Sequence, residues 1–388
     1  MSLPDSSSSS KPSEAQEPVS AATADGGSLS GQARSRQGRA RKDLDLPLKL
    51  QVASALARNG YYARVNVGLS ATSARGLSDV TDVDVLGMRY DIMFDPSAIA
   101  VSCKAGESRS LSPAREIFYL RGVLNYVRAT SGVVAFSRKP VAPHLRDLGR
   151  RLGVQVLSGS EVDAWCNSLI NGIADYGYFR EALYDQYLST WAQADMRGLA
   201  EYLRTDYWFH FDFRNLQNVV GHLRKIARRI TGQRPWHALV MLDTAAQFCL
   251  TMFDLCREVR LLGTSSVSET TAAYLFGGAP SFRARRDLYS RVHQLLSSTG
   301  VLSPGGPSLP PLEPVYTANL AELAVRFIDR PQAAVLVPQI IQDAFWRALG
   351  AVGAPPHDET NFLAAEKLAQ DLLDFLKGAG GAEWAPKI

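Results

Sequence analysis

The chain reads SDVTDVDVL from residue 78 to residue 86 and AVSCKAG from residue 100 to residue 106. On a β-strand, side chains two positions apart share one face. Asp82 and Asp84 are therefore expected to point the same way, while the valines between and after them point into a core. Ser102 and Lys104 likewise share a face of the following strand. If the two strands pair as neighbours, carboxylates and a lysine meet at one edge of a sheet.

The residues around these stretches predict a helix followed by three strands. Apolar residues recur at helical spacing from Pro47, and Asn59-Gly60 ends that pattern. The strands are expected at 61–69, 80–90 and 99–104, in an antiparallel meander. The Ser- and Gly-rich residues 70–78 are expected to form a turn or a mobile loop.

The next part of the chain alternates helices with short apolar strands. Ser112-Pro113 is typical of a helix start, and strands are expected at 133–136 and 154–157, separated by a helix at 144–152. Another helix is expected from Ser160 to Trp165. This alternation favours parallel strands covered by helices.

The carboxylates of Asp82 and Asp84 next to the ammonium group of Lys104 suit the hydrolysis of phosphodiester bonds. A divalent cation there needs one or two carboxylates, and a nearby lysine can offset charge that develops on the phosphate. The motifs and the element order resemble the PD-(D/E)xK, or restriction-endonuclease-like, nuclease superfamily over about residues 44–166. The resemblance implies a mixed-sheet α/β fold and a Mg²⁺- or Mn²⁺-dependent endonuclease.

The resemblance also implies roles for individual residues. Asp84 matches the metal-binding aspartate, Lys104 the catalytic lysine, and Asp82 an acidic position often seen two residues earlier. The main-chain carbonyl of Cys103 would be a further metal ligand. The cysteine side chain itself is expected to be a small buried hydrophobe.

Two positions depart from the family pattern. Ser102 stands where the D/E-x-K triplet has its acid, and the first helix lacks the glutamate that the family often places there, with Gln51 as the nearest polar residue. A hydroxyl is a weak Mg²⁺ ligand and adds no charge. A relocated carboxylate could come from one of four positions: Asp79, Asp82, Asp91 or Glu107.

Three functions stay open at this point. The first is a metal-dependent nuclease acting on nucleic acid, with DNA as the expected substrate. For this function the resemblance implies a place in restriction, repair or defence. The second is a catalytically degenerate nuclease fold that binds nucleic acid or a protein. The third is a helical interaction scaffold with a structural α/β domain.

The remainder of the chain suggests three segments. Residues 1–43 are low in large apolar side chains and basic at their end, and are expected to be disordered. Residues 44–168 form the α/β domain. Residues 169–388 are expected to be α-helical, with a break near 303–314, and to be where a protein partner or a second copy binds.

Composition favours a cytoplasmic protein without a membrane partner. No signal sequence is evident, and the four cysteines form neither a CxxC pair nor a zinc-finger pattern. The most apolar stretch, residues 237–256, contains Asp243 and Asp254, which favours a buried core helix over a membrane span. The two aspartates are either buried polar partners or a functional patch. The aromatic residues between 176 and 213 are more typical of core than of a base-stacking surface.

Overall fold

We describe the fold from a computed structural model of the chain. Residues 43–388 form one compact unit. The structure describes residues 43–73, 76–106, 112–127, 129–138, 140–170, 177–192, 196–209, 212–262, 266–302, 308–351 and 359–388. The expected disorder of residues 1–43 therefore falls almost entirely outside the described part of the chain.

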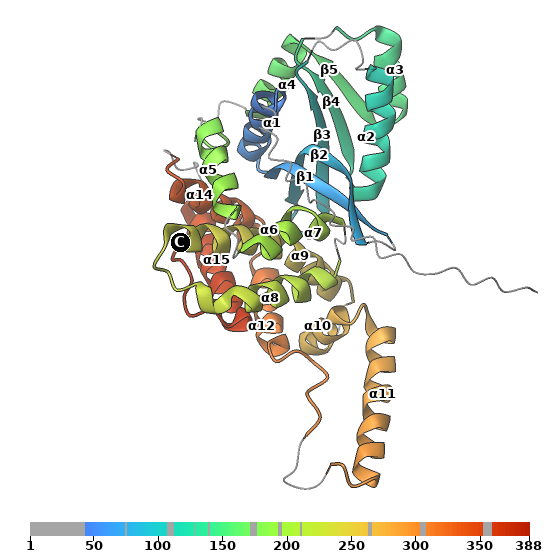
Figure 1. Cartoon of the computed structure of the whole chain (residues 1–388), viewed down its shortest axis with the longest axis vertical. Helices are drawn as coiled ribbons and strands as arrows, with labels where there is room; N and C mark the ends of the chain where they lie inside the picture. The colour runs from blue at the N-terminus through green and yellow to red at the C-terminus, as the bar shows by residue number, and fades with distance from the viewer. Residues whose placement is uncertain are drawn as a thin grey trace, which may run out of the picture. The chain divides into compact units, whose positions relative to one another are not determined.

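A five-stranded mixed sheet forms the N-terminal part, with the strands in chain order β1-β2-β3-β4-β5 (Figure 1). The strands are β1 (Tyr62–Ser73), β2 (Gly76–Tyr90), β3 (Pro96–Lys104), β4 (Ser131–Phe136) and β5 (Val154–Ser158). β1, β2 and β3 pair antiparallel, whereas β3, β4 and β5 pair parallel. The predicted meander and the predicted parallel strands are both confirmed.

Helices cover both faces of this sheet. α1 (Leu46–Arg58) and α4 (Ser160–Ile170) lie on one face, and α2 (Pro113–Val127) and α3 (Pro143–Arg151) lie on the other (Figure 1). The parallel strands are consequently buried along nearly their whole length. A Cβ atom on Gly132 of β4 would come within 2.9 Å of the Leu124 side chain, so the glycine permits the close approach of α2 to the sheet.

The expected loop at residues 70–78 is wrong. β1 continues to Ser73 and β2 begins at Gly76, with Ala71 paired with Ser78 after a register shift at Leu69/Ser70. Backbone hydrogen bonds form the hairpin, so small polar side chains can extend it although they give no apolar alternation. The last helix of this part, α4, also runs longer than expected and reaches Ile170 rather than Trp165.

The C-terminal part is helical, as predicted. The α-helices among its described residues are α5 (Glu181–Trp191), α6 (Arg197–Arg204), α7 (Asp206–Phe209), α8 (Arg214–Ile226), α9 (Pro235–Leu262), α10 (Val267–Leu275), α11 (Ala279–Ser298), α12 (Thr317–Asp329), α13 (Pro331–Ala334), α14 (Val337–Ala348) and α15 (Glu359–Gly380). Of the aromatic residues that open this part, Tyr184, Tyr187, Trp191, Tyr202 and Tyr207 are buried, so these five belong to the core.

α9 is the central helix of the C-terminal part. Its length and apolar composition would let it cross a membrane, but 94% of its most apolar window is buried inside the protein. α8, α10, α12, α14 and α15 all pack against it. The prediction of a buried core helix is therefore confirmed, while the cytoplasmic location stays a prediction.

The sheet and the helices share one continuous hydrophobic core. Arg64 of β1 forms a buried ion pair with Asp243 of α9, and Asp254 pairs with Arg257 and accepts a hydrogen bond from Tyr274. Asp243 thus has its ionic partner on the sheet, whereas Asp254 has both of its partners on helices. The boundary expected near residue 168 and the break near 303–314 stay predictions, the latter lying partly outside the described residues.

Candidate functional site

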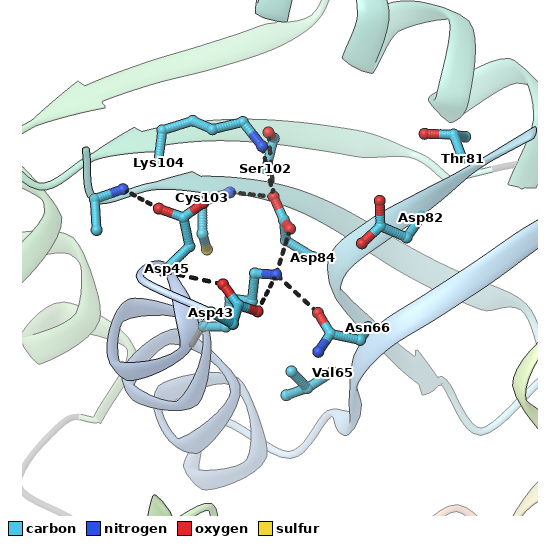
Figure 2. A network of polar contacts seen from close by, with 12 residues as sticks. Asp43, Asp45, Val65, Asn66, Thr81, Asp82, Asp84, Ser102, Cys103 and Lys104 are labelled. Carbon is cyan, nitrogen blue, oxygen red and sulfur yellow. Dashed lines mark hydrogen bonds and ion pairs between the residues drawn. The ribbon is translucent and has the colours of Figure 1, made fainter. Parts of the chain in front are cut away.

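Asp84 lies where the pairing between β2 and β3 ends. The last paired residues are Val85 and Val101, and beyond them the Asp84 carboxylate accepts a hydrogen bond from the Cys103 main-chain N–H at 2.8 Å. The Asp84 carboxylate therefore accepts the hydrogen bond that a backbone carbonyl of a paired strand would otherwise accept from Cys103. Figure 2 shows Asp84 at the centre of a polar network, between Asp43 and Asn66 on one side and Ser102 and Lys104 on the other.

Lys104 ends β3 and reaches back to this carboxylate. Its Nζ lies 3.1 Å from Asp84 Oδ2. The two side chains are largely buried, with 19% of Lys104 and 9% of Asp84 exposed. Strand register predicted this meeting, and the structure brings the two residues together as expected. Their proposed catalytic roles stay predictions.

A second carboxylate joins the cluster from α2. Glu116 Oε2 lies 3.8 Å from Lys104 Nζ and 3.4 Å from Ser102 Oγ, and the same hydroxyl is 3.4 Å from Asp84 Oδ2. Ser102 therefore stands between two carboxylates, and its single proton can be donated to one of them at a time. A carboxylate from α2 thus lies beside Ser102, although strand position 102 itself carries none.

Tyr119 fixes the part of α2 that carries Glu116. Its hydroxyl donates to the Asp82 main-chain carbonyl at 2.7 Å and also contacts the Thr81 hydroxyl. Glu116 and Tyr119 are three residues apart, so they project from neighbouring positions on the helix. Docking α2 onto β2 through Tyr119 holds Glu116 over Ser102.

Lys49 of α1 enters the cluster from the other side. Its Nζ lies 2.9 Å from Asp84 Oδ1, 2.9 Å from Asp43 Oδ2 and 2.8 Å from Asn66 Oδ1. An ammonium group has three protons to donate, and these three oxygens can accept all of them. Only 6% of the Lys49 side chain is exposed, so the charge is held within the protein.

Asn66 is placed at this point by an unusual backbone conformation. Its φ is +55°, in the left-handed region that Asn tolerates better than most residues. Val65 pairs with Val85 and Val67 with Val83, which puts the distortion of β1 opposite Asp84. Its side-chain amide also reaches the hydroxyl of Tyr184 on α5 at 3.5 Å, so the helical part of the chain touches the network.

The surrounding charges keep both lysines protonated. Burial alone would lower the pKa of each ammonium group. For Lys49, the Asp84 and Asp43 carboxylates outweigh burial and raise the pKa above its ordinary range. For Lys104, Asp84 and Glu116 likewise raise the pKa. Both ammonium groups are therefore fixed cations at physiological pH.

Cys103 contributes its backbone rather than its thiol. The side chain is fully buried, and burial raises the pKa of the thiol well above its usual value. A thiol kept protonated in this way is a poor nucleophile, as the sequence predicted. The other three cysteines, Cys166, Cys249 and Cys256, are also buried and unpaired.

The remaining candidate residues lie away from this centre or outside the described part. The Asp82 side chain is exposed, and no drawn contact in Figure 2 joins it to the network. Gln51 donates to Asp163 on α4, and Asp91 accepts from the backbone of its own turn. Neither of these two contacts reaches Asp84. The Asp79 side chain and Glu107 fall among the residues that the structure does not describe.

Sequence reasoning missed Lys49 and Glu116. Lys49 stands at helical spacing from the buried residues Val52, Ala53 and Leu56. Helical periodicity therefore puts it on the inward face of α1. Glu116 similarly precedes the buried Leu120 by one turn. A charged residue on the buried face of a helix next to a polar strand end is the signal that could have identified both.

The donors present suit a hard divalent cation. Mg²⁺ is commonly held by one or two carboxylates with water and phosphate oxygens, and Asp84 and Glu116 supply two carboxylates here. The Cys103 N–H points to Asp84, and the carbonyl of a strand residue points to the same side as its N–H. Within the described ranges, no group of three or more His, Cys, Asp or Glu side chains is arranged to hold a metal. The residues thus fit an ion that keeps several of its waters.

An open cleft lies beside the cluster. It has a volume of about 620 Å³, and its walls include Ala105 and Gly106, which directly follow Lys104, together with Ser137 and Arg138 after β4. The start of α1 closes it on the other side, where Asp45 accepts a hydrogen bond from the Ala105 N–H at 2.5 Å. The cleft therefore opens next to the strand end that carries Lys104.

No family model matches this chain, and the searches of curated proteins and of solved structures also give no match.

Proposed function

We propose that residues 44–168 form a restriction-endonuclease-like domain that hydrolyses phosphodiester bonds of nucleic acid, with DNA as the substrate. The observation that carries the proposal is the meeting of Asp84, Glu116 and Lys104 around Ser102 at the end of β3. Carboxylates with a lysine in a shielded position are what metal-assisted phosphodiester cleavage needs.

Each residue has a distinct task in this proposal. Asp84 and Glu116, with the Cys103 carbonyl, would hold a Mg²⁺ or Mn²⁺ ion, which would supply charge stabilisation and a more acidic water. Lys104, whose ammonium group lies beside both carboxylates, would offset negative charge on the phosphate once the substrate is bound. Ser102 keeps the two carboxylates apart and adds no charge.

The cleft beside Lys104 offers room for a nucleic-acid strand. Arg138 in its wall is exposed and provides a guanidinium group that suits phosphate oxygens. We assign the positioning of substrate or the binding of a partner to the helical residues 169–388, which contact β1 through Asp243 and the Asn66 side chain through Tyr184.

The experiment measures cleavage of plasmid and single-stranded DNA with Mg²⁺ or Mn²⁺. Wild type is compared with Lys104→Met, Glu116→Gln and the matched control Asp82→Asn, whose carboxylate is exposed. We expect metal-dependent cleavage to fall by about 100-fold or more in the first two variants, as is typical for loss of an electrostatic catalytic group. The control should retain most of the wild-type rate.

A second function is favoured by one observation, which is the buried ammonium of Lys49 on Asp84 Oδ1. A fixed positive charge beside the metal-binding aspartate lowers its attraction for a divalent ion. The second candidate is therefore a degenerate domain that binds nucleic acid or protein without cutting. DNA binding that persists in all variants, with no cutting by any form, would favour this candidate over the first.

A further inference from the structure

The two oxygens of Asp84 face different surroundings. Oδ1 contacts Lys49, which also contacts the Asp43 carboxylate and the Asn66 amide oxygen. Oδ2 contacts Lys104 and the Cys103 N–H, with Ser102 and Glu116 beyond. The carboxylate thus divides the cluster into an Oδ1 side and an Oδ2 side.

The Oδ1 side is an oxygen cradle of the kind that hard cations occupy. Its oxygens come from three separate segments, namely the turn before α1, strand β1 and strand β2, and all lie 2.8–2.9 Å from one nitrogen. Two carboxylate oxygens and one amide oxygen are ligands that Mg²⁺ and Ca²⁺ accept in proteins. Here the cradle holds an ammonium group.

Two features keep this ammonium in place. The side chain of Lys49 is 94% shielded from solvent on the inward face of α1, where its neighbours Leu48 and Leu50 are also buried. Asn66 adopts a left-handed backbone within a strand, and this conformation aims its amide oxygen at Nζ. Strained backbone persists only where the surrounding structure holds it, and it often marks a functional site.

The Oδ1 side and the Oδ2 side of Asp84 also differ in their net charge. The carboxylates of Asp43, Asp84 and Glu116 contact the ammonium groups of Lys49 and Lys104, and Asp45 also acts on Lys104 electrostatically, so negative charge exceeds positive charge in the cluster. Glu116, at 3.8 Å from Lys104, is the most loosely paired of the three. Beyond the shared Asp84, Lys104 faces two carboxylates, Glu116 and Asp45, whereas Lys49 faces one, Asp43, so the excess negative charge is on the Oδ2 side.

We propose that Lys49 is a resident cation that occupies the position of a second divalent ion, so that this site takes a single divalent ion on the Oδ2 side of Asp84. The inference rests on the proposed metal-dependent function and specifies it, since a one-ion site must rely on Lys49 and Lys104 for the charge that a second ion would bring. Lys49 acts through Asp84 and is a positioning residue.

The test is the number of Mn²⁺ ions that the full-length chain binds without nucleic acid, measured by isothermal titration calorimetry. Wild type is expected to bind one ion. Lys49→Met keeps the apolar stem but removes the charge, and it is expected to bind two. Lys49→Arg keeps the charge and is expected to bind one, as is the control Lys225→Met, which alters an exposed lysine on α8.

The number of Mn²⁺ ions that each protein binds decides whether the inference holds. Two ions in wild type, or only one in a Lys49→Met protein whose circular dichroism matches wild type, would overturn it. If Lys49→Met does not fold, the counts for wild type and Lys49→Arg still decide, because two ions in either refute a resident cation. No ion in wild type but one in Lys49→Met would overturn the single-ion site on the Oδ2 side and the metal-dependent function with it, although Lys49 would still be the cation that keeps an ion from the Oδ1 side. No ion in any protein would reject both.

Discussion

Replacing Asp84 by alanine removes a carboxylate that contacts two buried ammonium groups and one backbone N–H. Lys49 is 6% exposed and Lys104 19% exposed, so water reaches neither charge freely. Removing one partner of a buried ion pair costs about 3–5 kcal/mol. A buried donor left without an acceptor, here the Cys103 N–H, costs about 1–3 kcal/mol by itself. Asp43 and Glu116 still compensate part of the charge, so we expect a net loss of about 3–5 kcal/mol in the free energy of unfolding.

Urea unfolding followed by circular dichroism measures this loss. Asp82→Ala is the matched control two residues away on the same strand, and its exposed side chain should change stability by less than about 0.5 kcal/mol. The double variant Asp84→Ala/Lys49→Met removes both buried partners, so it should be more stable than Asp84→Ala alone. A loss below about 1 kcal/mol for Asp84→Ala, or a double variant that is less stable still, would refute the buried-network reasoning.

Three further predictions concern the charges and buried ion pairs of Lys104, Ser102 and Arg64. The pKa of Lys104 is raised, so its stabilising contribution is complete below the ordinary value of 10.5 and is lost as pH rises through the raised value. The stability difference between wild type and Lys104→Met in urea unfolding should therefore stay constant from about pH 7 to about pH 9 and narrow only at higher pH; a difference that narrows below about pH 9 would contradict the assignment. Ser102→Asp adds a third carboxylate between two others, so thermal melts should show a lower melting temperature without metal and a larger rise on adding Mg²⁺ than in wild type; an unchanged response to Mg²⁺ would argue against ion binding beside Ser102. Arg64→Met leaves Asp243 buried without its ion-pair partner and should lower the free energy of unfolding in urea by about 3–5 kcal/mol, and a change near zero would show that this pair does not join the sheet to α9.

Much of the fold followed from local patterns in the sequence. Alternation along β2 and β3 predicted the antiparallel meander and the shared face of Asp84 and Lys104, because strand periodicity depends only on neighbouring residues. The short apolar runs predicted β4 and β5 as covered parallel strands. These inferences needed no knowledge of how helices dock on the sheet.

The residues that were missed depend on that docking. Lys49 and Glu116 come from helices on opposite faces of the sheet, and their meeting with Asp84 is set by how α1 and α2 pack. Helical periodicity shows that each lies on or beside an inward face, but it does not show which strand residue the side chain meets. Asn66 was missed for a different reason, since a left-handed residue within a strand leaves no mark in the apolar pattern.

The ion pair between Arg64 and Asp243 is another contact that local sequence patterns could not predict. Both residues sit in apolar stretches, and 179 positions separate them along the chain. Sequence alone left Asp243 either as a buried polar partner or as part of a functional patch. The structure pairs it with Arg64 of β1, a contact that no local pattern encodes.

The most direct measurement is anomalous diffraction from crystals of the full-length protein grown with Mn²⁺. We expect one anomalous peak on the Oδ2 side of Asp84, within about 2.0–2.5 Å of Asp84 and Glu116 oxygens, with Lys49 still seated against Oδ1. A lattice that contains Mn²⁺ but shows no peak between Asp84 and Glu116, or a peak that displaces the Lys49 ammonium, would contradict the account.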